Sequence, residues 1–258
     1  MKVLERVGRA TNELFEYAGG VTLLSAESLG FMVRLRIRTA ETISQAALLG
    51  VQSAVIVMLT SLFTGMVISL ESAQQAVAYG VGNLVGGAVA YASVRELGPM
   101  LTGVVVAGRV GSAIAAELGS MVVTEQIEAL RSMGLEPARF LVVPRLVALL
   151  LMLPLLTVFA DVVSILGGGW IAQTYAHISH DAYVTSVRQS IDFSDVLKGL
   201  LKSVVFAVII AMVGAYQGLQ TRGGAAGVGK STTGAVVIAI ILIFVANFLL
   251  TFFLFGSR

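Results

Sequence analysis

The sequence predicts an all-α, polytopic integral membrane protein, and composition, apolar runs and charge placement all point to that class. Hydrophobic residues make up 57% of the chain, charged residues 12%, and the mean hydropathy is +0.91. This composition is typical of membrane proteins. Most apolar runs reach or exceed the roughly 20 residues that one crossing needs. We therefore expect transmembrane helices at residues 42–70, 72–108, 146–175, 199–217 and 231–255 of a single membrane domain, residues 1–258.

Charge and cysteine content exclude several other classes. The net charge of +2 is small, and the basic residues are spread along the chain instead of forming a nucleic-acid patch. The absence of cysteine excludes disulfides and thiolate metal sites. The 258 residues leave no room for a separate soluble catalytic domain. We expect neither enzymatic activity nor a cofactor within this chain.

The first 40 residues predict an N-terminal segment at the membrane interface. Residues 2–18 have the pattern of an amphipathic interfacial helix, and no apolar core follows the basic residues as it would in a signal peptide. The apolar face consists of Val3, Leu4, Val7, Leu14, Phe15 and Ala18. Gly19 and Gly20 are expected to break this helix. The apolar piece Val21–Val33 is interrupted by Glu27 and is too short to be counted as a span.

The connections between spans are predicted from charge and glycine. Glu71 is expected to close the first span, and Pro154 to kink the third. The acid-rich segment 176–198 and the glycine-rich segment 218–230 are expected to be loops, the second of them flexible.

The distribution of basic residues predicts the orientation. Basic residues precede the first span, occupy the second-to-third connection and flank the glycine-rich segment: Lys2, Arg6, Arg9, Arg34, Arg36, Arg38, Arg109, Arg131, Arg139, Arg145, Arg222 and Lys230. The opposite connections carry Glu71 and the acid-rich segment 176–198. By the positive-inside rule, the N-terminus is expected to be cytoplasmic and the C-terminus periplasmic.

The stretch from Arg95 to Arg145 changes from apolar to charged and organises the rest of the chain. A helix is expected from about Ser120 to Met133, with Gly134 as its stop and Pro137 beyond it. A short helix held between two spans is well placed to dock on a soluble partner. Small residues recur every four positions before it and predict close helix packing within the subunit rather than a dimer seam. They are Gly103, Ala107, Gly111, Ala115 and Gly119.

The motifs RELGP, AGRVGSAIAAELGSM, TEQIEALRSMGLEP and VVPR within this stretch resemble the MlaE/YrbE family. These are permease subunits of ABC-type phospholipid transport systems that work with MCE-domain lipid-binding proteins. The resemblance covers most of the chain from about residue 45 onward. It implies a bacterial inner-membrane permease, a homodimer or pair of similar chains, and a periplasmic MCE-type carrier. It also implies a separate cytoplasmic ATPase that binds ATP and Mg²⁺ and docks on residues 117–136.

The resemblance and the intramembrane charges together give a candidate lipid site. Residues matching Arg95, Glu96 and Lys202 lie near the lipid cavity in this family, and the stretch from Gly65 to Leu70 resembles one that borders the lipid path. Mutual pairing of the charges is the alternative, since charges inside a membrane commonly pair. Asp161 is assigned no role, and Asn247 stands where relatives often have an acid. The candidate lipid-binding residues are Met66, Leu70, Glu71, Arg95, Glu96 and Lys202.

For the ATPase contact, we expect charge from Glu125 and Glu128, with Leu130 and Met133 filling a groove of the partner. The full candidate set is Glu117, Thr124, Glu125, Gln126, Glu128, Leu130 and Met133.

Two further motifs are interpreted as unremarkable. Residues 224–231 match the phosphate-loop pattern G-x-x-x-x-G-K-[ST], but that loop needs a preceding strand in a soluble α/β core, whereas apolar spans flank it here. His177 and His180 could place two imidazoles beside the Asp181 carboxylate, but a complete set of metal ligands is not apparent, and this cluster is interpreted as a solvated loop. The predicted function is therefore an ATP-driven phospholipid permease. The alternatives are an ion-coupled secondary transporter, which needs no ATPase, and a membrane scaffold.

Overall fold

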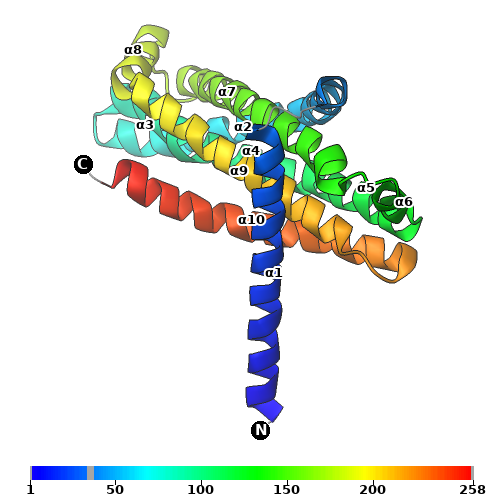
Figure 1. The fold of residues 1–258 in the computed structure, drawn as a ribbon. Helices are drawn as coiled ribbons and strands as arrows, with labels where there is room; N and C mark the ends of the chain where they lie inside the picture. Colours follow the sequence, from blue (N-terminus) through cyan, green and yellow to red (C-terminus); the bar gives the residue numbers. More distant parts are fainter. Residues whose placement is uncertain (1, 34–37, 257–258) are drawn as a thin grey trace.

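The computed structural model describes residues 2–33 and 38–256, apart from the side chains of residues 2–10, 13, 14 and 33. Arg34, Arg36 and the side chains of Lys2, Arg6 and Arg9 lie outside this description, as do those of Val3, Leu4, Val7 and Leu14. The described part is helical and has no strand (Figure 1). Its α-helices are α1 Lys2–Val33, α2 Thr39–Ala78, α3 Val85–Ala92, α4 Gly98–Val106, α5 Ser112–Val123, α6 Gln126–Ser132, α7 Val143–Thr174, α8 His180–Ser190, α9 Phe193–Leu219 and α10 Gly224–Phe255. A 3₁₀ turn, η1 Gly82–Leu84, precedes α3, and π-helical segments η2 Ser93–Leu97, η3 Ala107–Gly111 and η4 Ala138–Val142 link the helices around them.

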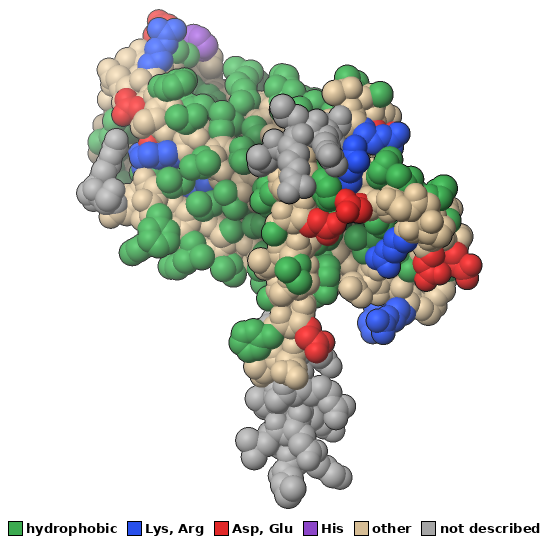
Figure 2. Space-filling model, in the orientation of Figure 1, with side chains coloured by type: hydrophobic (Ala, Val, Ile, Leu, Met, Phe, Trp, Pro, Cys, Tyr) green, Lys and Arg blue, Asp and Glu red, His purple; other side chains and the backbone are tan. Residues whose placement is uncertain are grey.

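Five helical stretches are long and apolar enough to cross a membrane, which confirms the predicted all-α polytopic fold. They are Thr39–Ala78, Gly82–Val123, Ala138–Thr174, Phe193–Leu219 and Gly224–Phe255. In Figure 1, α7, α9 and α10 run along the bundle, with α8 at one end and α6 at the opposite end. We call these the α8 end and the α6 end. On the face shown in Figure 2, charged side chains gather toward these ends, and hydrophobic side chains cover most of the surface between them.

The helices differ from the predicted spans at three boundaries. Glu71 does not end α2, which continues to Ala78 with Glu71 exposed on its surface. The second stretch begins at Gly82 instead of residue 72 and extends to Val123 instead of residue 108. Its 42 residues are about 63 Å long at 1.5 Å per residue, against about 30 Å of hydrocarbon. The stretch is therefore longer than one crossing of the apolar layer needs.

The ridge of small residues packs within the chain, as the sequence predicted. Ala107 and Ala115 are fully buried in this helix. A Cβ at Gly103 would lie 3.1 Å from Phe206 of α9, and one at Gly119 would lie 2.7 Å from Thr221. Close approach of the second stretch to α9 therefore requires small residues along this face.

The N-terminal helix is continuous, so the expected break at Gly19 and Gly20 does not occur. Gly20 lies against α9, where an added Cβ would come within 2.2 Å of the Tyr216 hydroxyl. The Tyr17 and Tyr216 rings meet edge to face, with centroids 5.1 Å apart. A glycine inside a helix costs about 1 kcal/mol relative to alanine, and this contact offsets that cost. Figure 1 shows α1 crossing the bundle and projecting from it toward the N-terminus.

The acid-rich segment expected to be a loop contains helix α8. Ser179 caps this helix by accepting a 3.3 Å hydrogen bond from the Ala182 backbone N–H. Tyr183 is buried against α3 and α7, and its hydroxyl donates to the Ile165 carbonyl at 2.9 Å. Burial raises the pKa of Tyr183 to about 12. The α8 end of the bundle is therefore ordered by a packed helix.

The glycine-rich segment 218–230 is not a flexible loop either. Gly223 and Gly224 take left-handed φ angles of +90° and +67° and turn the chain into α10, which begins at Gly224. The phosphate-loop pattern thus forms the first two turns of α10. It follows helix α9, and no strand precedes it in the described residues.

Candidate functional site

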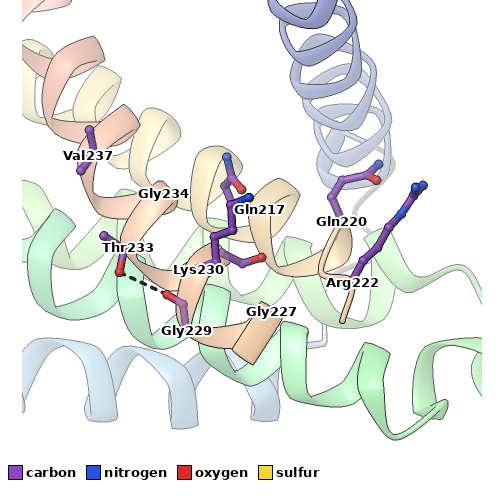
Figure 3. A pocket seen from close by; sticks show the side chains of 10 residues that line it. Gln217, Gln220, Arg222, Gly227, Gly229, Lys230, Thr233, Gly234 and Val237 are labelled. Atoms are coloured by element: carbon purple, nitrogen blue, oxygen red, sulfur yellow. Dashed lines mark hydrogen bonds between the residues drawn. The ribbon is translucent and has the colours of Figure 1, made fainter. Parts of the chain in front are cut away.

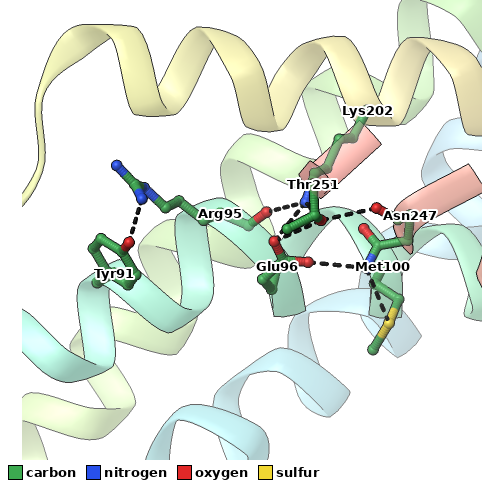
Figure 4. Close-up of polar contacts among 7 residues, drawn as sticks. All are labelled: Tyr91, Arg95, Glu96, Met100, Lys202, Asn247 and Thr251. Atoms are coloured by element: carbon green, nitrogen blue, oxygen red, sulfur yellow. Dashed lines mark hydrogen bonds and ion pairs between the residues drawn. The ribbon is translucent and has the colours of Figure 1, made fainter. Parts of the chain in front are cut away.

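The structure brings together three of the candidate lipid-binding residues, Arg95, Glu96 and Lys202, in one polar network (Figure 4). Arg95 and Glu96 lie in the π-helical segment η2, and Lys202 lies in α9. Asn247 and Thr251, four residues apart on α10, complete the network. These elements belong to three different membrane-spanning stretches.

Lys202 is the centre of the network and is fully buried. Its Nζ donates to Glu96 Oε1 at 2.7 Å, to Thr251 Oγ1 at 2.8 Å and to the Arg95 carbonyl at 2.7 Å. The last contact has a cause in the sequence. Residue 99, four positions after Arg95, is a proline without an N–H, so the Arg95 carbonyl has no α-helical donor there and accepts from Lys202 instead.

Glu96 is the most accessible member of the ion pairs in this network, with 34% of its side chain exposed. Its Oε1 accepts from Lys202 and lies 2.9 Å from the Thr251 hydroxyl, and its Oε2 accepts from Asn247 Nδ2 at 2.9 Å. The carboxylate is therefore held from two helices. Charge-assisted hydrogen bonds of this kind are stronger than neutral ones.

Arg95 is buried and held on both sides. Its Nη2 lies 2.6 Å from Asp195 Oδ1, and its Nη1 donates to the Tyr91 hydroxyl. The guanidinium carbon lies 4.1 Å from the Tyr91 ring centroid and 4.4 Å from that of Phe255, a cation–π arrangement. Arg95 Nε, by contrast, is buried and has no hydrogen-bond acceptor within the described part of the chain.

Sequence reasoning missed Asp195 and Thr251 and gave Asn247 no firm role. Asp195 was placed in the acid-rich loop, but it lies in the first turn of α9 and also closes a capping box with Asp192. The D-x-x-D spacing at residues 192–195 is a helix-start signal that could have found it. Asn247 and Thr251 are polar residues at helical spacing in an otherwise apolar run, which is the signal for an inward face.

The three candidate residues on α2 are not brought to this network. Met66 packs on α7, where its Cγ is 3.3 Å from a Cβ built at Gly167. Leu70 is half-buried, and Glu71 is exposed. No hydrogen bond or ion pair links Glu71 to the network in the described ranges. Within one chain, the candidate lipid site is therefore divided between two places.

The candidate coupling residues also lie in two separate places, one on α5 and the others at α6. Glu117 lies in α5, where its carboxylate lies 2.7 Å from Nη2 of the buried Arg145 at the start of α7. The expected helix from Ser120 to Met133 is wrong at its start, because α5 ends at Val123 and Glu125 turns the chain with a φ of +60°. Gly134 ends the segment with a φ of +71°, as predicted.

Helix α6 itself presents a mixed surface at the α6 end. Ile127 is buried against the bundle, whereas Met133 just beyond the helix is 64% exposed. Leu130 is half-buried, and the four polar candidates Thr124, Glu125, Gln126 and Glu128 are exposed. Among these, Thr124 Oγ1 accepts from Gln126 Nε2 at 3.0 Å. The helix is thus anchored by one apolar residue and exposes its acids.

Asp161 lies apart from the network, buried in α7 against Gly98. A Cβ at Gly98 would come within 1.7 Å of Asp161 Oδ1, so glycine at this position makes room for the carboxyl group. Asp161 Oδ1 has no hydrogen-bond partner among the residues described.

The fold defines a polytopic membrane protein with a buried ion network among its spans. A model of the family Permease MlaE matches residues 42–253. The chain is 44% identical over 220 residues to a probable ABC transporter permease protein of Synechocystis sp., an alignment that covers 85% of this chain and 84% of that protein. It is 34% identical over 255 residues to a probable ABC transporter permease protein of Rickettsia typhi, covering 99% and 98% of the two chains.

It is also 36% identical over 235 residues to the chloroplastic protein TRIGALACTOSYLDIACYLGLYCEROL 1 of Arabidopsis thaliana, covering 91% of this chain and 67% of that one. The chain belongs to the MlaE permease family. It is therefore a permease subunit of the ABC transporter class and a multi-pass membrane protein.

Proposed function

We propose that this chain is the permease subunit of an ATP-driven phospholipid transporter of the bacterial inner membrane. It moves lipid between that membrane and a periplasmic MCE-type carrier. ATP and Mg²⁺ bind to a separate cytoplasmic ATPase docked at the α6 end, and the α8 end faces the periplasm. The name of the Arabidopsis relative, which refers to a galactolipid, supports a lipid as the substrate class.

The buried ion network carries this proposal. Charges inside a membrane span are costly and mark substrate paths or paired contacts. Lys202 has three internal acceptors, so its donors are used within the chain and it positions Glu96. Arg95 differs, since its Nε–H has no acceptor among the residues that the structure describes. A phosphate oxygen of a lipid headgroup is a suitable acceptor for that donor.

A second copy of the chain completes the proposed site. Met66 and Leu70 on α2 lie away from the network of their own chain, although the family resemblance places both groups beside the lipid. In a homodimer, α2 of one protomer can approach the network of the other. The exposed aromatic face of α10, with Phe248 70% and Phe253 73% exposed, provides apolar surface for such a contact or for lipid tails.

Removing Arg95 is expected to reduce the phospholipid that co-purifies with the protein. Because an Arg95→Gln single variant strands Asp195, the better test is the double variant Arg95→Gln/Asp195→Asn, which removes both charges of the pair. We expect bound phospholipid, measured by mass spectrometry of the purified dimer, to fall about tenfold, as for loss of one charge-assisted hydrogen bond. The control is Arg188→Gln on the exposed surface of α8. An intact dimer with undiminished lipid would contradict the proposal.

Charge reversal on α6 is expected to release the ATPase. Glu125 and Glu128 are exposed and have no ion-pair partner in the described residues, so Glu125→Lys/Glu128→Lys leaves the fold intact. If the acids of α6 meet basic groups of the ATPase, the introduced lysines place like charges opposite each other, and this opposes association. We expect the ATPase to be lost from affinity purifications of this double variant, whereas Asp181→Lys at the α8 end retains it. Undisturbed assembly would refute this docking site, and a wild-type chain that purifies without any ATPase would favour the ion-coupled alternative.

A further inference from the structure

One cavity among the described residues lies away from the ion network. It measures about 820 Å³ and lies between the end of α9 and the start of α10, at the α6 end. Figure 3 shows Lys230 of α10 beside Gln217 of α9, with Gln220 and Arg222 nearby. Lys230 and Asn247 are 17 residues apart on the same helix, or about 25 Å at 1.5 Å per residue. The cavity is therefore distinct from the network.

The lining of this cavity is basic and contains no acid. Arg222 and Lys230 both line it and are exposed, and neither side chain makes a hydrogen bond or an ion pair with another described residue. The buried cations of the bundle are different, since Arg95, Arg145 and Lys202 each have a carboxylate within 2.7 Å. Figure 3 shows Arg222 and Lys230 on different sides of the cavity, and each attracts an anion that enters it.

Glycines keep the cavity open. Gly227, Gly229 and Gly234 form part of its wall and contribute no side chains to fill it. A Cβ at Gly227 would lie 1.9 Å from the Arg222 carbonyl oxygen, so glycine lets the Arg222 segment pack against the start of α10. Gly229 faces open space, with no atom within 4 Å of a Cβ built there.

Neutral donors accompany the cations. The side-chain amides of Gln217 and Gln220 line the cavity. The Ser231 hydroxyl lies 2.9 Å from that of Thr221 at the turn between the helices. Arginine, lysine and amide donors around an open space are the groups that bind phosphate oxygens.

We propose that this cavity binds a phosphate group, carried either by the headgroup of an anionic phospholipid or by a soluble phosphate. The site is separate from the proposed transport path. It is not a nucleotide-binding loop, because Lys230 lies within the continuous helix α10 and not in a loop between a strand and a helix.

The test uses the full-length chain in detergent and follows its thermal unfolding as each probe is added. The probes are inorganic phosphate and dihexanoyl phosphatidylglycerol, a soluble anionic phospholipid. A ligand that binds only the folded state raises the unfolding temperature with its concentration. In Arg222→Gln/Lys230→Gln, the apparent Kd of the effective probe is expected to rise at least about tenfold, as for loss of a charge-assisted contact.

A matched pair at Gly229 tests charge separately from shape. Gly229→Glu adds a carboxylate to the cavity and is expected to raise the apparent Kd of the probe, as the double variant does. Gly229→Gln adds the same bulk without charge and is expected to bind more tightly than Gly229→Glu. Lys198→Gln, outside the cavity, is expected to match the wild type.

If inorganic phosphate raises the unfolding temperature of the wild type but not that of the variants, the site binds a soluble phosphate. Stabilisation by the short-chain lipid alone identifies a headgroup site. If neither probe stabilises the wild type, or if the double variant responds as fully as the wild type, the proposal is wrong. Lipid retention by the Arg95 network is measured separately and can stand or fall independently of this result.

Discussion

Replacing Lys202 with methionine is expected to destabilise the protein by about 3–5 kcal/mol, the cost of removing one partner of a buried ion pair. Methionine fills most of the space but donates to none of the three oxygens that Lys202 now satisfies. Glu96 then keeps its charge with only neutral donors, Asn247 and Thr251. The measurement is the detergent-solubilised unfolding temperature.

A second substitution distinguishes the ion pair from simple packing. Glu96→Gln in the Lys202→Met background removes the stranded carboxylate and is expected to restore a large part of the lost stability, because replacing both partners costs less than replacing one. Lys198→Met, one turn earlier on α9 and half-buried, is the matched control and is expected to have little effect. Equal stability of Lys202→Met and Lys198→Met would show that the network does not stabilise the bundle.

The spans could be predicted from sequence because an apolar run long enough to cross a bilayer is a strong, local signal. The ends of the helices could not be predicted in the same way. Glu71 stops an apolar run in sequence, but a carboxylate on an exposed helix surface does not end a helix, and α2 continues for seven more residues. Likewise, α8 was missed because Tyr183 is stabilised by burial against α3 and α7, contacts that are distant in sequence.

The core of the polar network could be predicted, but not its full membership. Arg95, Glu96 and Lys202 are charged in apolar surroundings and therefore conspicuous. Asp195 is not conspicuous in the sequence. Its ion pair with Arg95 depends on where α9 begins and on the groups, such as Tyr91, that surround Arg95. Whether a charge is paired or accessible is a property of three-dimensional packing. This is why Lys202, expected near a headgroup, proves to be fully enclosed.

The candidate coupling segment shows the same limit. Glu117 looked like part of a charged surface because other charges follow it within a few residues. In the structure, Glu117 forms an ion pair with Arg145, 28 positions later, and this pair holds α5 to the start of α7. Glu125 and Glu128 are exposed, and their contact with an ATPase stays a prediction.

Replacing Gly65 with alanine is expected to give the largest loss of stability of any single methyl addition in α2. A Cβ at this position would lie 2.0 Å from the Ser164 carbonyl oxygen and 2.6 Å from its carbonyl carbon. These are backbone atoms of α7, so no side chain can rotate away, and the two helices must separate. Overpacking of this kind costs about 3 kcal/mol, the upper end of its usual range. Thermal unfolding in detergent measures the effect.

Gly30→Ala in α1 is the matched control, because an added Cβ there meets no atom within 4 Å. Alanine is favoured over glycine inside a helix by about 1 kcal/mol, so this variant is expected to be neutral or slightly stabilised. The pair therefore separates the steric contact between α2 and α7 from the general effect of glycine on helices. If Gly65→Ala unfolds at the same temperature as Gly30→Ala, α2 and α7 are not packed backbone against backbone at Ser164.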